Sequence, residues 1–258
     1  MKLRGYLALV VIFTVFLFAD LIQRTVIQLR VRLRPTRRVQ ILGSWIQAMG
    51  AFVLGTVERI GGASLPEPQR VVPCGPGVLI VMNHQSLLDI PLVVKTVDSG
   101  YPRIVTRARY HRFIPLISHM VRLYQYPVVD PSAKLRQIIA SLQSLQREAR
   151  DSPVPLAIFP EGTRTRDGSI GPFKTRGLER ILSARDWTIH VFVADGFWET
   201  AKLKDFLGGM SHLEGRMAYL GKVAWNDPTE DPEPFIEHLR ETMVQGLDRL
   251  RSGRGAAA

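Results

Sequence analysis

The chain has 258 residues, of which 46% are hydrophobic and 22% charged, and its formal net charge is +11. This composition excludes a disordered polar chain, and the length suits one α/β domain with an appendage or two small domains. The single cysteine, Cys74, excludes an internal disulfide, and the spacing of the Cys and His residues does not fit a zinc site. We therefore expect no structural metal.

The positive charge is concentrated near the N-terminus. Residues 1–70 hold ten Lys or Arg residues and three Asp or Glu residues, so they carry +7 of the +11. Such a skew is typical of proteins that meet nucleic acid, a membrane surface or an anionic substrate. Because the neighbouring segments are apolar and no nucleic-acid-binding module accompanies them, we expect an anionic membrane surface as partner and no nucleic acid.

Residues 6–19 are almost wholly apolar and follow Lys2 and Arg4. A cleaved signal peptide, a membrane span and a helix that lies in one leaflet are the three interpretations. Leu17 would occupy the third position before a cleavage after Ala19, where a small residue is needed. Asp20 interrupts the run, which is short of the roughly 20 apolar residues of a span. We favour uncleaved membrane attachment and leave the choice between span and re-entrant helix open.

Two further segments complete the N-terminal region. Residues 24–38 hold six arginines, which we expect to meet anionic headgroups, and residues 29–34 alternate with period two, a poor pattern for a helix. Residues 41–57 form a second apolar helix, rich in small residues, that packs on the first helix or serves equally well as a core helix of the soluble domain. If the first segment spans the membrane, the basic excess holds the active domain on the cytoplasmic side, at the inner membrane in a bacterium.

From residue 77 onward, strand-like and helix-like runs alternate, which favours a mixed, largely parallel sheet flanked by helices. We expect a membrane-associated helical region over residues 1–62 and an α/β domain over residues 63–258. The expected strands are 78–82, 103–106, 125–129, 155–159, 188–194 and 215–225. The expected helices are 87–97, 114–123, 133–150, 175–183, 198–207 and 232–251.

The first chemical motif follows the buried strand 78–82. The strand ends at Asn83, His84 comes next, and Asp89 follows five residues later. An aspartate that opens the next helix can accept one imidazole N–H and leave the other nitrogen free as a base. Taken alone, this pair is more simply explained as a turn histidine and a helix-capping aspartate.

The second motif follows the strand 155–159. It begins at Pro160 and includes Glu161, Gly162, Thr163 and Arg164. A glycine-containing loop lets backbone N–H groups approach an oxyanion, and an arginine can grip two phosphate oxygens. An ordinary surface turn explains this loop equally well when it is considered alone. Lys174 and Arg176, at an expected helix start, supply further positive charge.

Together the two motifs, Asn83-His84-x-x-x-x-Asp89 and Phe159-Pro-Glu-Gly-Thr-Arg164, resemble those of the glycerolipid acyltransferase family that includes the 1-acylglycerol-3-phosphate acyltransferases. Phe173-Lys174-x-x-Gly177 and the strand at residues 191–194 resemble that family's later blocks. The resemblance covers roughly residues 70–225.

The resemblance implies an O-acyltransferase that uses acyl-CoA or acyl-carrier protein as co-substrate and no cofactor. His84 would take the proton from the free hydroxyl of a lysophospholipid, and Asp89 would orient the imidazole. The resemblance implies acceptor binding by Arg164, with Lys174 and Arg109 as further anion contacts. It also assigns Asn83, Glu161, Gly162 and Thr163 to the substrate-binding part of the site.

One departure from the family pattern concerns the acceptor. Pro131 follows Asp130 where the family usually has a phosphate-binding arginine. Arg107, Arg109, Arg122 or Lys134 compensates, or the acceptor is another lysolipid or an aminolipid rather than lysophosphatidic acid. A membrane protein that binds lipid without catalysis is the alternative from a different class, and the intact His84 and Asp89 argue against it.

Overall fold

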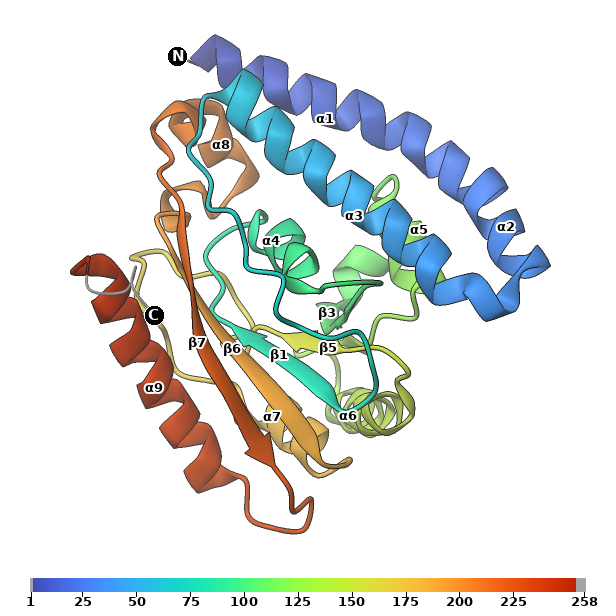
Figure 1. Cartoon of the computed structure of the whole chain (residues 1–258), viewed down its shortest axis with the longest axis vertical. Helices are drawn as coiled ribbons and strands as arrows, with labels where there is room; N and C mark the ends of the chain where they lie inside the picture. Colours follow the sequence, from blue (N-terminus) through green and yellow to red (C-terminus); the bar gives the residue numbers. More distant parts are fainter. Residues whose placement is uncertain (1, 254–258) are drawn as a thin grey trace.

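The computed structural model describes residues 2–253 and confirms the predicted fold class, a mixed, largely parallel sheet flanked by helices (Figure 1). Within these residues, five strands form the main sheet in the order β2-β5-β1-β6-β7. The strands are β2 (Arg103–Ile104), β5 (Leu156–Ile158), β1 (Val78–Met82), β6 (Trp187–Asp195) and β7 (Arg216–Trp225). The first four run parallel, and β7 pairs antiparallel with β6.

A smaller parallel pair, β3 (Thr106–Arg107) and β4 (Val128–Val129), lies beside the main sheet. The helices after β1 are α4 (Asp89–Thr96), η4 (Ala108–His111), α5 (Ile117–Leu123), α6 (Leu135–Asp151), α7 (Thr175–Leu182), η5 (Trp198–Thr200), α8 (Leu203–Gly209), η6 (Met210–His212) and α9 (Glu233–Arg251). The predicted helix over residues 198–207 is therefore a 3₁₀ turn followed by α8.

The two faces of the sheet are buried in different cores. Along β1, Ile80 and Met82 belong to the core that includes the N-terminal helices and α4, whereas Leu79 and Val81 belong to the core beneath α6, α7 and α9. All five residues of β1 are buried. A parallel strand that is covered on both faces needs such a continuous apolar run, which is why the sequence identifies it well.

The chain begins with a helical hairpin that lies across one side of the domain (Figure 1). Its elements are α1 (Lys2–Ile22), the π-helical turn η1 (Gln23–Ile27), α2 (Gln28–Leu33), η2 (Pro35–Arg37), α3 (Arg38–Thr56) and the π-helical turn η3 (Val57–Gly61). Two stretches, Leu3–Leu33 and Pro35–Gly61, are long and apolar enough to cross a membrane. Only 17% of the apolar window in the first stretch is buried, which is unlike a core helix of a soluble protein.

Three sequence expectations differ from the structure. Residues 29–34 are mostly helical, in α2, because they continue α1 and turn only Val31 inward while the arginines point to solvent. The expected strand 103–106 is divided between the main sheet and the β3–β4 pair. Of the expected strand 125–129, only Val128–Val129 forms a strand, β4. For α3, both alternatives left open by the sequence hold in part, because α3 packs on α4 and also contacts α1, with Gly43 against Gly100 and Gly50 against Pro91.

The division of the chain at residue 62 stays a prediction, because α3 packs directly on α4. Residues 254–258 of the expected second domain lie outside the described residues.

Candidate active site

The carboxyl end of β1 places the first motif in the centre of the sheet, between β5 and β6. Asn83 is fully buried, and its side chain pairs with the backbone of Ala194 on β6. Asn83 Nδ2 donates to Ala194 O at 2.9 Å, and Ala194 N donates to Asn83 Oδ1 at 2.7 Å. Both polar atoms of Asn83 are therefore used within the protein, which fixes the backbone direction into His84.

His84 and Asp89 contact each other directly. His84 Nδ1 lies 2.7 Å from Asp89 Oδ2, and Asp89 is fully buried as the first residue of α4. The same carboxylate oxygen accepts the backbone N–H groups of Gln85 at 2.6 Å and Ser86 at 2.8 Å. Because an ionised carboxylate only accepts, we assign the His84 proton to Nδ1, which leaves Nε2 as an acceptor. The His84 side chain is 17% exposed, so Nε2 is open to a substrate.

The second motif wraps around the backbone of the first. His84 N donates to Glu161 Oε1 at 2.8 Å, and Thr165 N donates to His84 O at 2.9 Å. The His84 ring stacks on Phe159, which directly follows β5, with ring centroids 4.4 Å apart. Two loops that lie about seventy residues apart in the sequence thus form one hydrogen-bonded unit at the carboxyl ends of β1 and β5.

Glu161 joins three segments of the chain. Its second carboxylate oxygen, Oε2, accepts the N–H of Gly171 at 3.1 Å while Oε1 accepts that of His84. Burial raises the pKa of Glu161 to about 7, although the two backbone N–H groups favour the charged form. This side chain is 4% exposed, so its role is to hold the loops together rather than to contact a ligand.

Gln85 is a structural partner that the sequence did not reveal. Its side chain is fully buried, donates to Gly168 O at 3.2 Å and accepts the N–H of Phe197 at 3.0 Å. It therefore connects the histidine turn to the loop after the second motif and to the end of β6. Phe159 was also missed as a contact of His84, because only the fold brings the two rings together.

Gly162 connects the corner formed by Asn83, His84, Asp89 and Glu161, the candidate catalytic corner, to a basic groove. Its φ of +63° favours glycine, and a Cβ at this position would approach the aliphatic part of Lys174 at 3.0 Å. The Gly162 carbonyl accepts a hydrogen bond from Arg107 Nη2. The groove itself has a volume of about 880 Å³. Its wall includes Arg107, Arg109, Arg112, Lys174, Asp130 and Pro131.

Of the remaining predicted residues, Arg109 lines this groove, whereas Arg164 and Thr163 are not among its lining residues. Arg109 is exposed, donates to Tyr110 Oη at 2.8 Å and lies over the tyrosine ring. Arg164 is half-buried, and its Nη1 has no hydrogen-bond partner among residues 2–253. Thr163, which lies between Gly162 and Arg164 in the sequence, is exposed. An unpartnered guanidinium nitrogen is suited to an anionic ligand.

Pro131 stands where the resembled family usually has a phosphate-binding arginine, and its position shows which basic residues lie near it. Pro131 follows β4, while Arg107 ends the adjacent β3, so both line the same groove. Arg109 lines it as well. Arg122 donates to His111 O at 2.7 Å, and Lys134 lies at the start of α6; neither is among the groove's lining residues. Arg112 also lines the groove, and the sequence had not marked it.

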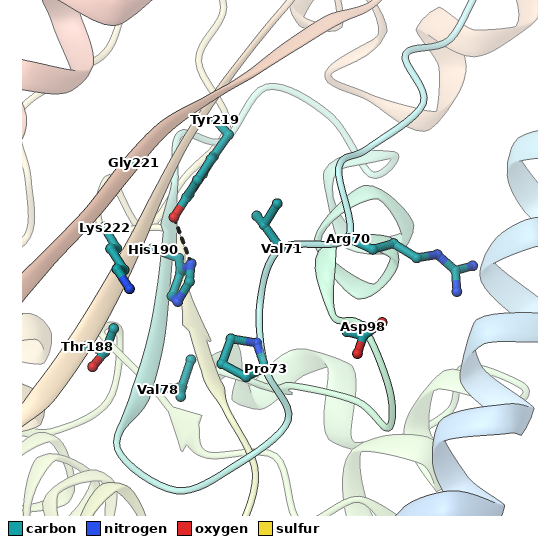
Figure 2. A pocket seen from close by; sticks show the side chains of 10 residues that line it. All are labelled: Arg70, Val71, Pro73, Val78, Asp98, Thr188, His190, Tyr219, Gly221 and Lys222. Atoms are coloured by element: carbon teal, nitrogen blue, oxygen red, sulfur yellow. Dashed lines mark hydrogen bonds between the residues drawn. The ribbon is translucent and has the colours of Figure 1, made fainter. Parts of the chain in front are cut away.

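A second hollow, of about 780 Å³, lies at the other end of the parallel strands (Figure 2). Its wall includes His190 of β6, whose Nδ1 lies 3.0 Å from the Tyr219 hydroxyl of β7, together with Arg70 and Lys222. Residues of the two motifs do not line it. It is thus separate from the candidate active site.

The fold and this corner define an acyltransferase. A family model described as Acyltransferase matches residues 65–194, just over half of the chain, so the protein belongs to that family. The chain is similar to a probable 1-acyl-sn-glycerol-3-phosphate acyltransferase of Mycoplasma pneumoniae, with 33% identity over 109 residues, which are 42% of this chain and 40% of the relative. It is 27% identical to the 1-acyl-sn-glycerol-3-phosphate acyltransferase of Cocos nucifera over 152 residues, or 58% of this chain and 45% of the relative.

These alignments span less than half the length of the two relatives. Among solved structures, the chain is similar to the 1-acyl-sn-glycerophosphate (LPA) acyltransferase PlsC of Thermotoga maritima, with a TM-score of 0.72, 17% identity and 98% coverage of both chains. At that identity the likeness shows the fold. The predicted family is thereby confirmed.

Proposed function

We propose that this protein transfers an acyl chain from acyl-CoA or acyl-carrier protein to the free hydroxyl of a lysophospholipid, with 1-acylglycerol-3-phosphate as acceptor and phosphatidic acid as product. The observation that carries the proposal is the His84–Asp89 pair, whose imidazole Nε2 is free at the carboxyl end of β1. Family membership and the printed activity of the relatives support the same reaction.

In the proposed mechanism, His84 Nε2 takes the proton of the acceptor hydroxyl as that oxygen attacks the thioester carbonyl. The tetrahedral intermediate then collapses, the C–S bond breaks, and the proton on Nε2 passes to the departing thiolate. Asp89 holds the imidazole in the required tautomer and stabilises its transient positive charge. Positioned proton transfer of this kind contributes roughly 10²–10⁴-fold to the rate.

The acceptor phosphate is proposed to occupy the basic groove. Arg107 and Arg109 take the part of the family arginine that Pro131 replaces. Arg164 of the second motif and Lys174 at the start of α7 add positive charge. The groove adjoins the catalytic corner through Gly162, whose neighbour Glu161 holds His84. Asn83, Glu161 and Gly162 serve this site as positioning residues, because their side chains or backbone hold the two loops.

The N-terminal hairpin is proposed to lie in one leaflet rather than to span the membrane. Near the start of α1, Arg4 donates to Ile60 O of the hairpin's own turn η3 at 3.1 Å, and α1 packs there on α8 of the domain (Figure 1). Just after α1, Gln23 of η1 donates to Leu116 O of the domain at 3.3 Å. These contacts are about 28 Å apart along the helix, at 1.5 Å per residue. A helix that is tied to the domain at both ends lies along its surface, so its exposed apolar side enters a bilayer from one side.

The active domain is proposed to face the cytoplasm, at the inner membrane in a bacterium. The arginines of residues 24–38 support this side, because the cytoplasmic leaflet carries the anionic lipids that attract such segments.

The decisive experiment assays purified full-length protein with acyl-CoA, acyl-carrier protein and lysophosphatidic acid. His84→Ala is expected to lower kcat by about 10²–10⁴-fold, the typical contribution of a positioned general base. His238→Ala, on the exposed side of α9, is the matched control and is expected to retain full activity. Full activity of His84→Ala overturns the mechanism.

Another lysolipid or an aminolipid is the second candidate acceptor, and one observation favours it. Asp130 places a carboxylate in the otherwise basic groove, and hydrogen bonds from Ser132 hold the pKa of Asp130 below its usual range. A negative charge there suits the ammonium group of a zwitterionic acceptor. A panel of lysolipids separates the two candidates. If the protein acylates lysophosphatidylethanolamine but not lysophosphatidic acid, the second candidate is favoured.

The alternative from a different class is a lipid-binding protein without catalysis. Tight binding to liposomes, with no turnover of any acyl donor, favours that alternative.

A further inference from the structure

The loop between η4 and α5 presents an aromatic side chain to solvent. Phe113 is 96% exposed, the highest fraction among the exposed large hydrophobic side chains described within residues 2–253. Its φ is +68°, and that of Leu116 in the same loop is +62°, a backbone region that side chains other than glycine rarely adopt. A strained backbone that turns an apolar ring outward suggests a function for the ring.

Several hydrogen bonds hold this loop in place. Ile114 N donates to Ser118 Oγ at 2.9 Å, and Ser118 Oγ donates to Tyr110 O at 3.0 Å. Arg122 Nη1 donates to His111 O at 2.7 Å. The exposure of the phenyl ring is therefore a property of an ordered loop.

The same loop is fastened to the N-terminal hairpin. Leu116 N donates to Asp20 Oδ1 at 2.9 Å, and Gln23 Nε2, in the π-helical turn η1, donates to Leu116 O at 3.3 Å. In Figure 1 the light-green loop lies beside the hairpin, in agreement with these bonds. Leu17 and Leu21 are exposed within one turn of Asp20, at 47% and 60%. The loop therefore borders the exposed apolar side of α1.

Charge complementarity identifies the partner. Arg109, Arg112 and Arg122 are exposed in or beside the loop, and Arg24 lies next to its attachment point on the hairpin. An apolar tip surrounded by guanidinium groups matches a bilayer that contains anionic lipid, with the ring among the acyl chains and the arginines at the phosphates.

We propose that residues 112–114 form a second membrane contact, in which Phe113 inserts into the same leaflet as the hairpin. Arg109 and Arg112 belong both to the rim of this contact and to the wall of the basic groove. Insertion therefore places the mouth of the groove at the depth of the lipid headgroups. This consequence rests on the proposed function, since there an acceptor phosphate enters the groove without leaving the membrane surface.

The test uses the full chain in proteoliposomes that contain phosphatidylglycerol and phosphatidylcholine. In a Cys74→Ser background, single cysteines replace Phe113, Leu17 and Glu230, and each is labelled with the environment-sensitive dye NBD. Glu230 lies in the exposed loop between β7 and α9, far from the hairpin (Figure 1). We expect the probes at 113 and 17 to emit at shorter wavelength and to be quenched by brominated acyl chains, whereas the probe at 230 does neither.

A probe at position 113 that behaves like the one at 230 overturns the proposal, whatever the catalytic activity. If the probe at 113 is buried in lipid while no lysolipid is acylated, the membrane contact stands and the proposed function fails. The two outcomes are thus distinguishable.

A second measurement separates membrane contact from a structural role. Phe113→Ser is expected to raise KM several-fold for a long-chain lysophosphatidic acid presented in vesicles, and to leave kcat/KM unchanged for a short-chain, water-soluble acceptor. Leu135→Ser, which removes a 66% exposed side chain from α6, is the control. An equal loss of activity on both acceptors assigns Phe113 to folding and overturns the proposal.

Discussion

The catalytic corner and the basic groove adjoin each other, yet they are built in opposite ways. In the corner, Asp89 and Asn83 are fully buried, and Asp89 Oδ2 alone accepts three hydrogen bonds. In the groove, Arg109 and Arg112 are exposed, and the wall comes from three separate segments of the chain.

This difference separates chemistry from recognition. A general base needs a fixed tautomer and direction, and buried hydrogen bonds supply both. Recognition of a phosphate needs positive charge nearby, so under the proposed function we expect neighbours such as Arg107, which lines the same groove, to offset the arginine that Pro131 replaces. Substitutions in the corner should therefore lower kcat, whereas substitutions in the groove should mainly raise KM.

Asp89→Asn gives the largest expected effect. The amide preserves the shape of the turn but removes the charge that stabilises protonated His84, so kcat should fall on the order of 10²–10⁴-fold. Steady-state kinetics of the purified protein check this, with exposed Asp186→Asn as control. A loss confined to KM, with kcat intact, contradicts the role of Asp89.

Glu161→Gln tests the rigidity of the corner through pH. Folded Glu161 keeps its proton up to a pKa of about 7, whereas the unfolded chain loses it near 4.5. Its stabilising contribution is thus fully present below pH 4.5 and is lost as the pH rises through about 7. Glutamine lacks this titration, and its NH₂ group leaves one of the two backbone N–H donors without an acceptor, at a cost of about 1–3 kcal/mol.

We therefore expect the wild-type protein to exceed Glu161→Gln in Tm by the largest margin near pH 4.5, and the margin to shrink toward pH 7. Thermal unfolding in detergent micelles at a series of pH values measures it. A margin that does not shrink between those pH values would show that the buried carboxylate is ionised throughout.

The sequence predicted the corner well because its parts are local. The bounds of β1, residues 78–82, agree with the continuous apolar run, and the five-residue interval from His84 to Asp89 corresponds to a turn into α4. The second motif followed a buried strand in the same way. That these two loops lie together follows from the pairing of β1 with β5, which a parallel sheet makes natural.

The groove was only partly predictable because its parts are distant. Arg107 reaches the groove through the β3–β4 pair, and the expected single strand at 103–106 gave no sign of that division. Arg112 and Gln85 carry no local pattern that marks a function. The helical form of residues 29–34 was missed for a related reason, since continuation from α1 outweighs their local alternation.

The double variant Arg109→Gln, Arg112→Gln tests the groove. Exposed ion pairs contribute up to about 1 kcal/mol each, so the loss of two should raise KM for lysophosphatidic acid roughly tenfold while kcat is retained. Higher salt should diminish the difference between wild type and variant. Arg249→Gln, an exposed substitution on α9, serves as the control. An unchanged KM would remove the acceptor phosphate from this groove.

Pro131→Arg gives the smallest expected effect and bears most directly on the acceptor. Pro131 is exposed on the groove wall, so an arginine there is accommodated without disturbing buried groups. If lysophosphatidic acid is the natural acceptor, the added guanidinium should lower its KM by a few-fold, corresponding to less than about 1 kcal/mol. Pro131→Ala, which removes the ring without adding charge, controls for the change in backbone freedom.

Two outcomes would show that Pro131 marks a different acceptor specificity. In the first, the arginine raises KM for lysophosphatidic acid; in the second, it lowers KM only for a zwitterionic acceptor, through a changed interaction with Asp130. The proline would in that case be a selective feature of the groove, because the neighbouring arginines would already supply all the charge that the acceptor needs.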